Sequence, residues 1–154
     1  MAEGIISQMA EHLKEYGGMA LIIDYGYMGP AVGDSLQAVQ KHKYHDVLLN
    51  PGQVDLTAHV DFTVLRQAAV KAGATVHGPT TQGAFLTELG INYRAAQLNN
   101  VATPKEMDQI DRSLHRLIHP EQMGSLFKVM AICGQQTPKP VGFSQCIQAA
   151  SSSL

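Results

Sequence analysis

The chain has 154 residues, 45% of them hydrophobic, and a formal net charge of −2 at pH 7. This length and apolar content suffice for one domain with a single core, and they exclude global disorder. The scattered lysines and arginines form no basic surface that would predict nucleic-acid binding. The longest apolar run, Met19 to Ile23, is far too short to span a bilayer. We therefore expect a globular protein that binds neither nucleic acid nor a membrane.

The first predicted elements are a helix, a glycine turn and a buried strand. The helix is indicated by apolar residues at helical spacing, namely Ile5, Ile6, Met9 and Leu13. Gly17 and Gly18 end it, because glycine readily adopts the left-handed conformation found after helices. The run from Met19 to Ile23 is apolar throughout, which predicts a parallel strand covered on both faces. This order is typical of an α/β fold.

Residues 28 to 60 show no sustained periodicity, so we predict a long lid or binding loop there. Asp61 has the position of an N-cap for a helix that extends to Ala72. A short strand is predicted from Ala74 to Gly78. Two short helices are expected at residues 85–89 and 91–98.

The start of the next helix is the clearest local signal. Thr103 and Glu106 have capping-box spacing around Pro104, which suits the first helical position. A last strand is expected from Leu126 to Cys133. A flexible tail is predicted for residues 134–154, which hold two prolines and a run of three serines directly before the final leucine.

A first candidate site follows the apolar strand, at Asp24, Tyr25, Gly26 and Tyr27. In open α/β sheets, ligands bind outside the carboxyl ends of the strands. A carboxylate and two phenols there could hold a cationic or polar group. The alternative is a solvated strand end with a glycine turn.

A second candidate is the stretch from Asp55 to Asp61, where Asp55, Thr57, His59 and Asp61 alternate with other residues. In an extended chain these four side chains share one face. They could form a metal site, an acid–base relay, or ordinary hydrogen bonds in a loop and a helix cap. No second histidine lies nearby at a familiar zinc spacing, and the two cysteines, Cys133 and Cys146, lack CxxC spacing. We therefore expect no metal.

Four blocks of sequence together resemble the C-terminal half of the MidA-like methyltransferases. The blocks are ALIIDYGY, HKYHDVLLNPGQVDLTAHVDF, VHGPTTQGAFLTELGI and PEQMGSLFKVMAI. That family has a class I, Rossmann-like fold, uses S-adenosyl-L-methionine, and includes the mitochondrial arginine methyltransferase that assists assembly of respiratory complex I. The resemblance covers residues 1–133. It implies that the predicted strands are the fifth, sixth and antiparallel seventh of the family sheet, with a helical insertion between the last two.

The chain departs from this family at the cofactor site. Family members bind S-adenosyl-L-methionine through a glycine-rich loop after the first strand, and no G-x-G pattern occurs in these 154 residues. We therefore expect a substrate-side half, inactive alone, whose partners are the N-terminal half and a protein substrate. Exposed apolar strand edges would also allow a homo-oligomer. A non-catalytic assembly module is the alternative function.

The resemblance implies roles for the candidate residues. Asp24 would hold the guanidinium of a substrate arginine, and Tyr25 and Tyr27 would line the pocket or stack on the cation. His59 and Asp61 would shape the adjoining loop. The compartment would be the cytoplasm in a bacterium and the mitochondrial matrix in a eukaryote.

Overall fold

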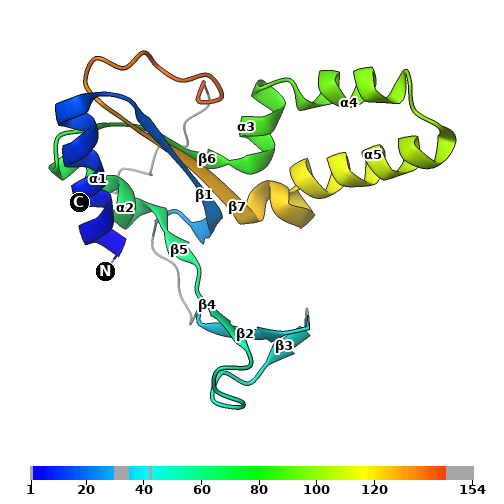
Figure 1. The fold of residues 1–154 in the computed structure, drawn as a ribbon, viewed down its shortest axis with the longest axis horizontal. Helices are drawn as coiled ribbons and strands as arrows, with labels where there is room; N and C mark the ends of the chain where they lie inside the picture. The colour runs from blue at the N-terminus through cyan, green and yellow to red at the C-terminus, as the bar shows by residue number, and fades with distance from the viewer. Residues whose placement is uncertain (1, 30–34, 42, 145–154) are drawn as a thin grey trace, which may run out of the picture.

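The computed structural model describes residues 2–29, 35–41 and 43–144. It contains a four-stranded sheet in the order β5-β1-β7-β6 and a separate three-stranded sheet in the order β3-β2-β4 (Figure 1). The elements in chain order are α1 (Ala2–Tyr16), β1 (Met19–Tyr27), β2 (Gln37–Gln40), β3 (Lys43–His45), β4 (Asp55–Thr57), β5 (Val60–Asp61), α2 (Phe62–Lys71), β6 (Thr75–Thr81), α3 (Gln82–Glu88), α4 (Ile91–Asn99), α5 (Pro104–Ile118), η1 (Pro120–Gly124) and β7 (Phe127–Cys133).

The central sheet confirms the predicted α/β fold and the antiparallel direction of its last strand. β7 lies between β1 and β6 and runs antiparallel to both. β1, β6 and β7 thus take the relative places expected for the fifth, sixth and seventh strands. Helices α3, α4 and α5 form the predicted insertion between β6 and β7, and they project away from the sheet as an arm (Figure 1).

Local sequence signals located the end of α1 and the starts of α2 and α5 correctly, whereas α3 begins at Gln82, three residues before the expected start. Gly17 and Gly18, with φ of 77° and 96°, end α1. Asp61 is the N-cap of α2, and its Oδ1 accepts hydrogen bonds from the backbone N–H groups of Thr63 at 2.9 Å and Val64 at 3.2 Å. Each of these signals acts within a few residues, so it does not depend on the rest of the fold.

One face of the sheet carries the main core. Helices α1 and α2 pack there through buried apolar side chains, namely Ile6, Ala10, Leu13, Phe62, Leu65 and Ala69. From the sheet, β7 contributes Met130 and Ile132, which are completely buried, and β1 contributes the partly buried Ala20 and Ile22. The apolar side chains that recur at helical spacing in α1 and α2 therefore pack against those at every second position of the strands, in a single layer.

The prediction that β1 is covered on both faces is wrong for this chain. On the face opposite α1 and α2, Met19 is 49% exposed, and Leu21 and Ile23 are each 46% exposed. The physical reason is that the described residues supply no helix over this part of the sheet. Coverage there is limited to β6 and β7, where Phe85 and Phe143 pack on Val129 and Ala131.

Two other regions also differ from the expectations. The predicted loop at residues 28–60, of which residues 30–34 and 42 lie outside the described part, contains β2, β3, β4 and the start of β5, whose pairing the aperiodic sequence did not reveal. Residues 134–144, placed in a flexible tail by the sequence, pack back on the sheet, where Phe143 is only 1% exposed. The carboxylate of Glu88 accepts hydrogen bonds from the backbone N–H groups of Gly142 and Ser144. Residues 145–154, including Cys146, lie outside the described part.

Candidate functional site

The carboxyl end of β1 brings together segments that are distant in the sequence. Tyr25 lies opposite Phe127 of β7, and Gly26 lies opposite Val60 of β5. A Cβ atom at position 26 would collide with the carbonyl oxygen of Val60 and press on the ring of Phe62. Glycine is thus required for β5 to approach β1, and this approach carries His59 to the strand end.

An aromatic cluster forms at this strand end. The ring centroids of Tyr25 and His59 are 5.5 Å apart at an interplanar angle of 68°. Those of Tyr25 and Phe127 are 5.7 Å apart at 83°. Both pairs have the edge-to-face geometry that aromatic rings prefer. The sequence singled out Tyr25 and His59 but missed Phe127, which only the antiparallel register of β7 places beside them.

Asp24 and Tyr25 project to opposite faces of the sheet, because successive residues of a strand alternate. The Oδ1 atom of Asp24 accepts a hydrogen bond from the backbone N–H of Tyr25 at 2.8 Å. Across the strand pair, Asp24 lies opposite Lys128, whose Nζ instead donates to the carbonyl oxygens of Ser125 and Leu126. Burial lowers the pKa of Lys128. In the described part of the chain, the second carboxylate oxygen of Asp24 has no hydrogen-bond or ion-pair partner.

The residues of the alternating row from Asp55 to Asp61 have different surroundings. Asp55 is exposed on β4, and His59 contacts Tyr25. Asp61 caps α2, and it lies opposite Tyr27 in the register of β1 and β5. The hydroxyl oxygen of Thr57 is buried without a hydrogen-bond partner among the described residues. Within those residues, no three histidine, cysteine, aspartate or glutamate side chains gather to hold a metal ion. The hydrogen-bonding role is thus the one observed for Asp61.

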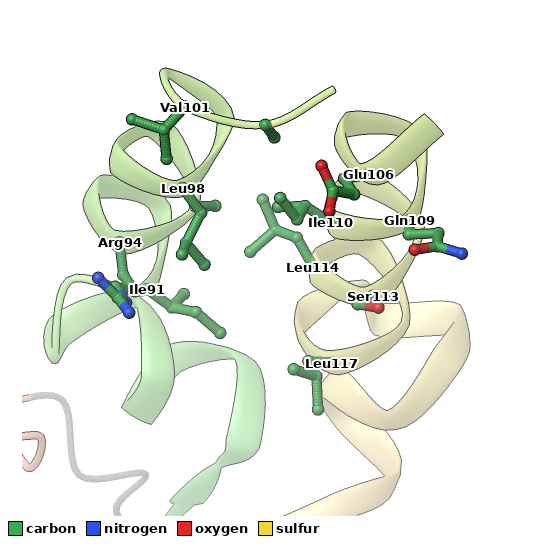
Figure 2. Close-up of a pocket in the computed structure, with 12 residues that line it drawn as sticks. Ile91, Arg94, Leu98, Val101, Glu106, Gln109, Ile110, Ser113, Leu114 and Leu117 are labelled. Atoms are coloured by element: carbon green, nitrogen blue, oxygen red, sulfur yellow. The ribbon is translucent and has the colours of Figure 1, made fainter. Parts of the chain in front are cut away.

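A separate feature is an apolar groove of about 490 Å³ between α4 and α5 (Figure 2). The groove is lined mainly by Ile91, Ala95, Leu98, Ile110, Leu114 and Leu117. None of the six residues proposed from the sequence lines it. No helix in the portion the structure covers is long and apolar enough to cross a membrane.

The strand order β1-β7-β6, with the central strand antiparallel to both neighbours, is consistent with the sheet of Rossmann-like methyltransferases. Residues 1–80 match the family described as "Putative S-adenosyl-L-methionine-dependent methyltransferase". The chain belongs to this family, whose cofactor is S-adenosyl-L-methionine.

Curated relatives extend the similarity beyond the family match. The chain is 38% identical over 152 residues to mitochondrial protein arginine methyltransferase NDUFAF7 of Xenopus tropicalis, covering 93% of this chain and 34% of the relative. Over 133 residues it is 36% identical to the Homo sapiens protein of that name, covering 86% and 30%. This chain therefore spans about a third of the length of these relatives.

Two crystal structures from Burkholderia thailandensis share the fold. One, an uncharacterised protein of the COG1565 superfamily, gives a TM-score of 0.76 at 28% identity, over 94% of this chain and 38% of that one. The other, a member of the same superfamily bound to S-adenosyl-homocysteine, gives 0.73 at 28% identity, over 94% and 37%. The similarity covers β1 through β7 and the helical arm, because it includes nearly the whole chain.

Proposed function

We propose that this chain is the acceptor-side part of an S-adenosyl-L-methionine-dependent protein arginine methyltransferase. The observation that carries the proposal is the Tyr25, His59 and Phe127 cluster at the carboxyl end of β1, in a chain of this family. Substrates of open α/β sheets bind at this end of the strands. The names of the mitochondrial relatives support arginine as the methylated side chain.

The chemistry of the cluster suits a guanidinium group. This group is planar and cationic, so it is attracted to aromatic faces and to carboxylates. Tyr25 and Phe127 would flank the acceptor, and His59 would fix the orientation of Tyr25. Asp24 lies on the other face of the sheet from Tyr25, so its second carboxylate oxygen would approach the cation from the opposite side of β1. Tyr27 would line the approach, whereas Asp61 maintains the start of α2.

The residues of this chain do not fit the cofactor itself. A bound nucleotide cofactor needs a close approach of glycine backbone, and no G-x-G pattern occurs in the sequence. We therefore assign S-adenosyl-L-methionine to another part of the methyltransferase and assign to this chain the orientation of the acceptor.

The bare side of β1 supports such a second part. From Met19 to Tyr25, the described residues pair with β1 only through β7. An unpaired strand edge beside half-exposed Leu21 and Ile23 is a surface that folded proteins normally cover. We propose that the cofactor-binding part of the fold covers it, and that residues 1–133 form the domain on this side. A protein substrate and a location in mitochondria, or in the bacterial cytoplasm, follow from the same proposal.

Titration calorimetry with S-adenosyl-homocysteine tests this division of labour. We expect no heat of binding with this chain alone, and transfer of methyl groups to arginine only when a cofactor-binding part from a relative is supplied. The cofactor-binding part of the relative, titrated without this chain, serves as the control for cofactor affinity. Micromolar binding by this chain alone would contradict the proposal.

A non-catalytic assembly module remains a second candidate, favoured by the apolar groove between α4 and α5. Such a module would bind its partner protein without any methylation. The same assays separate the two functions. A cofactor-binding part is supplied and shown to bind S-adenosyl-homocysteine, and an assembly module would then still show no methyl transfer.

A further inference from the structure

The apolar face of α5 is incompletely covered in the described part of the chain. This helix is strongly amphipathic, yet none of its 15 residues is buried. Ile110, Leu114 and Leu117 are only partly covered by α4, and Met107 is 39% exposed. A helix with an apolar stripe is normally stabilised by burying that stripe. The groove therefore leaves apolar surface of α5 that a partner would bury.

The two sides of the groove carry opposite charges. Arg94 lies on the α4 side and Glu106 on the α5 side (Figure 2). Glu106 accepts hydrogen bonds from the backbone N–H and hydroxyl of Thr103, but neither charge has an ion-pair partner in the described residues. The ion pair seen on α5 joins Asp108 and Arg112, which do not line the groove. A groove with one cation and one anion on its rim is complementary to itself.

The position of the arm also suits a second copy. The hairpin of α4 and α5 extends away from the main sheet, so a second hairpin can reach it without displacing the body of the molecule (Figure 1). Two antiparallel helices that share one open apolar face are half of a four-helix bundle. In homo-oligomers, the commonest arrangement that would complete such a half is a second copy related by a two-fold axis.

We propose that two copies of this chain pair through their α4–α5 hairpins to form a four-helix bundle. Leu98, Ile110 and Leu114 of each copy would form the shared core. Arg94 would face the partner subunit's Glu106, and the two-fold axis would repeat that pair. The formation of this dimer does not depend on methyl transfer.

Analytical ultracentrifugation of the full chain tests the dimer between about 1 and 100 μM, a range that detects dissociation constants typical of weak and moderate complexes. We expect a dimer for the unmodified chain and a monomer for Leu114→Glu, which places a charge in the apolar core. The matched control is His115→Glu, on the next residue of α5, which does not line the groove. It should remain dimeric. Circular dichroism checks that both variants keep their helices.

Charge reversal tests the pairing without altering the apolar core. Arg94→Glu should weaken the dimer about tenfold, since two symmetric exposed pairs are lost. Adding Glu106→Lys to Arg94→Glu should restore much of the affinity with the charges exchanged. Thr103→Ala removes the capping partner of Glu106 without changing charge, so it controls for damage to the start of α5.

Two results would overturn the proposal. A monomeric unmodified chain across this range would assign the groove to another part of the methyltransferase or to a helix of another protein. A dimer that persists in Leu114→Glu and dissociates in Leu21→Glu would show association through the bare face of β1 instead.

Discussion

The two faces of the β1-β7-β6 sheet differ in how completely this chain covers them. Against α1 and α2, Met130 and Ile132 are fully buried and Phe62 fills the space between helix and sheet. On the opposite face, Val129 and Ala131 are covered by Phe85 and Phe143, whereas the neighbouring strand β1 leaves Leu21 nearly half exposed. Side chains of similar polarity thus have different surroundings on the two faces.

This difference shows where the chain is self-sufficient and where it depends on other surfaces. The α1–α2 face has the buried layer that stabilises a domain by removing apolar area from water. The bare part of the other face gains little in this way. The same contrast recurs in the arm, where α5 presents an apolar stripe without a complete core.

The largest expected effect is on the covered face. Phe62→Ala should lower the free energy of unfolding by about 3–5 kcal/mol, because it removes a completely buried ring and leaves a cavity. Leu21→Ala on the bare face should cost less than about 1 kcal/mol, because nearly half of that side chain is already in water. Urea unfolding followed by circular dichroism measures both. Equal losses would show that the bare face is covered in solution, for instance by self-association.

The second prediction concerns the strand end that positions the aromatic cluster. Gly26→Ala should destabilise the fold by about 1–3 kcal/mol, since the new methyl group meets the carbonyl of Val60 and forces β5 away. Gly4→Ala is the matched control. It meets no atom within 4 Å in α1 and should stabilise the helix by about 0.5–1 kcal/mol.

Nuclear Overhauser contacts between Tyr25 and His59 should disappear in Gly26→Ala and persist in Gly4→Ala. If the contacts survive in a Gly26→Ala protein of normal stability, the close approach of β5 does not position His59.

The third prediction separates Asp24 from Asp61 in the complete methyltransferase. Asp24→Asn should lower kcat/KM for an arginine substrate by about tenfold to a hundredfold, because charge-assisted hydrogen bonds contribute roughly 1.5–3 kcal/mol. The melting temperature should hardly change, since the amide oxygen can still accept from Tyr25. Asp61→Asn, an equally good helix cap, should leave kcat/KM nearly unchanged. Normal turnover together with a lower melting temperature for Asp24→Asn would identify Asp24 as structural.

The smallest expected effect is at the segment that covers part of the second face. The hydroxyl of Ser144 donates to Glu88 and, with neighbouring backbone N–H groups, lowers the pKa of this carboxyl below its ordinary value of 4.5. The stabilisation that ionised Glu88 provides is therefore complete above pH 4.5 and is lost as the pH falls through the lowered pKa of Glu88.

Urea midpoints from pH 7 to pH 3 measure this contribution. Glu88→Gln should unfold slightly more easily at pH 7, and its midpoint should converge with that of the unmodified chain at low pH. Glu11→Gln, on an exposed position of α1, should keep the original pH profile. A constant difference at every pH would exclude ionisation of Glu88 as the cause.

Short-range patterns in the sequence were enough to predict most local elements and the family. Asp61 as a cap, the capping box of Thr103 and Glu106, and the glycines after α1 all act within a few residues of the chain, so their spacing is sufficient evidence. Four blocks of residues, in the order in which they occur along the chain, were enough to indicate a methyltransferase of this family. The apolar run from Met19 also predicted a strand, although it did not show which of its faces would be covered.

Contacts between segments far apart along the chain could be learned only from the folded structure. Phe127 reaches Tyr25 because β7 returns antiparallel after the helical arm, and Phe143 is buried because Glu88 holds the chain that follows β7. The pairing of β2, β3 and β4 likewise joins segments without hydrophobic periodicity. Register and burial depend on chain segments far apart in sequence, whereas caps and periodicity depend on near neighbours. The sequence could therefore predict the elements of the candidate site but not its aromatic partner.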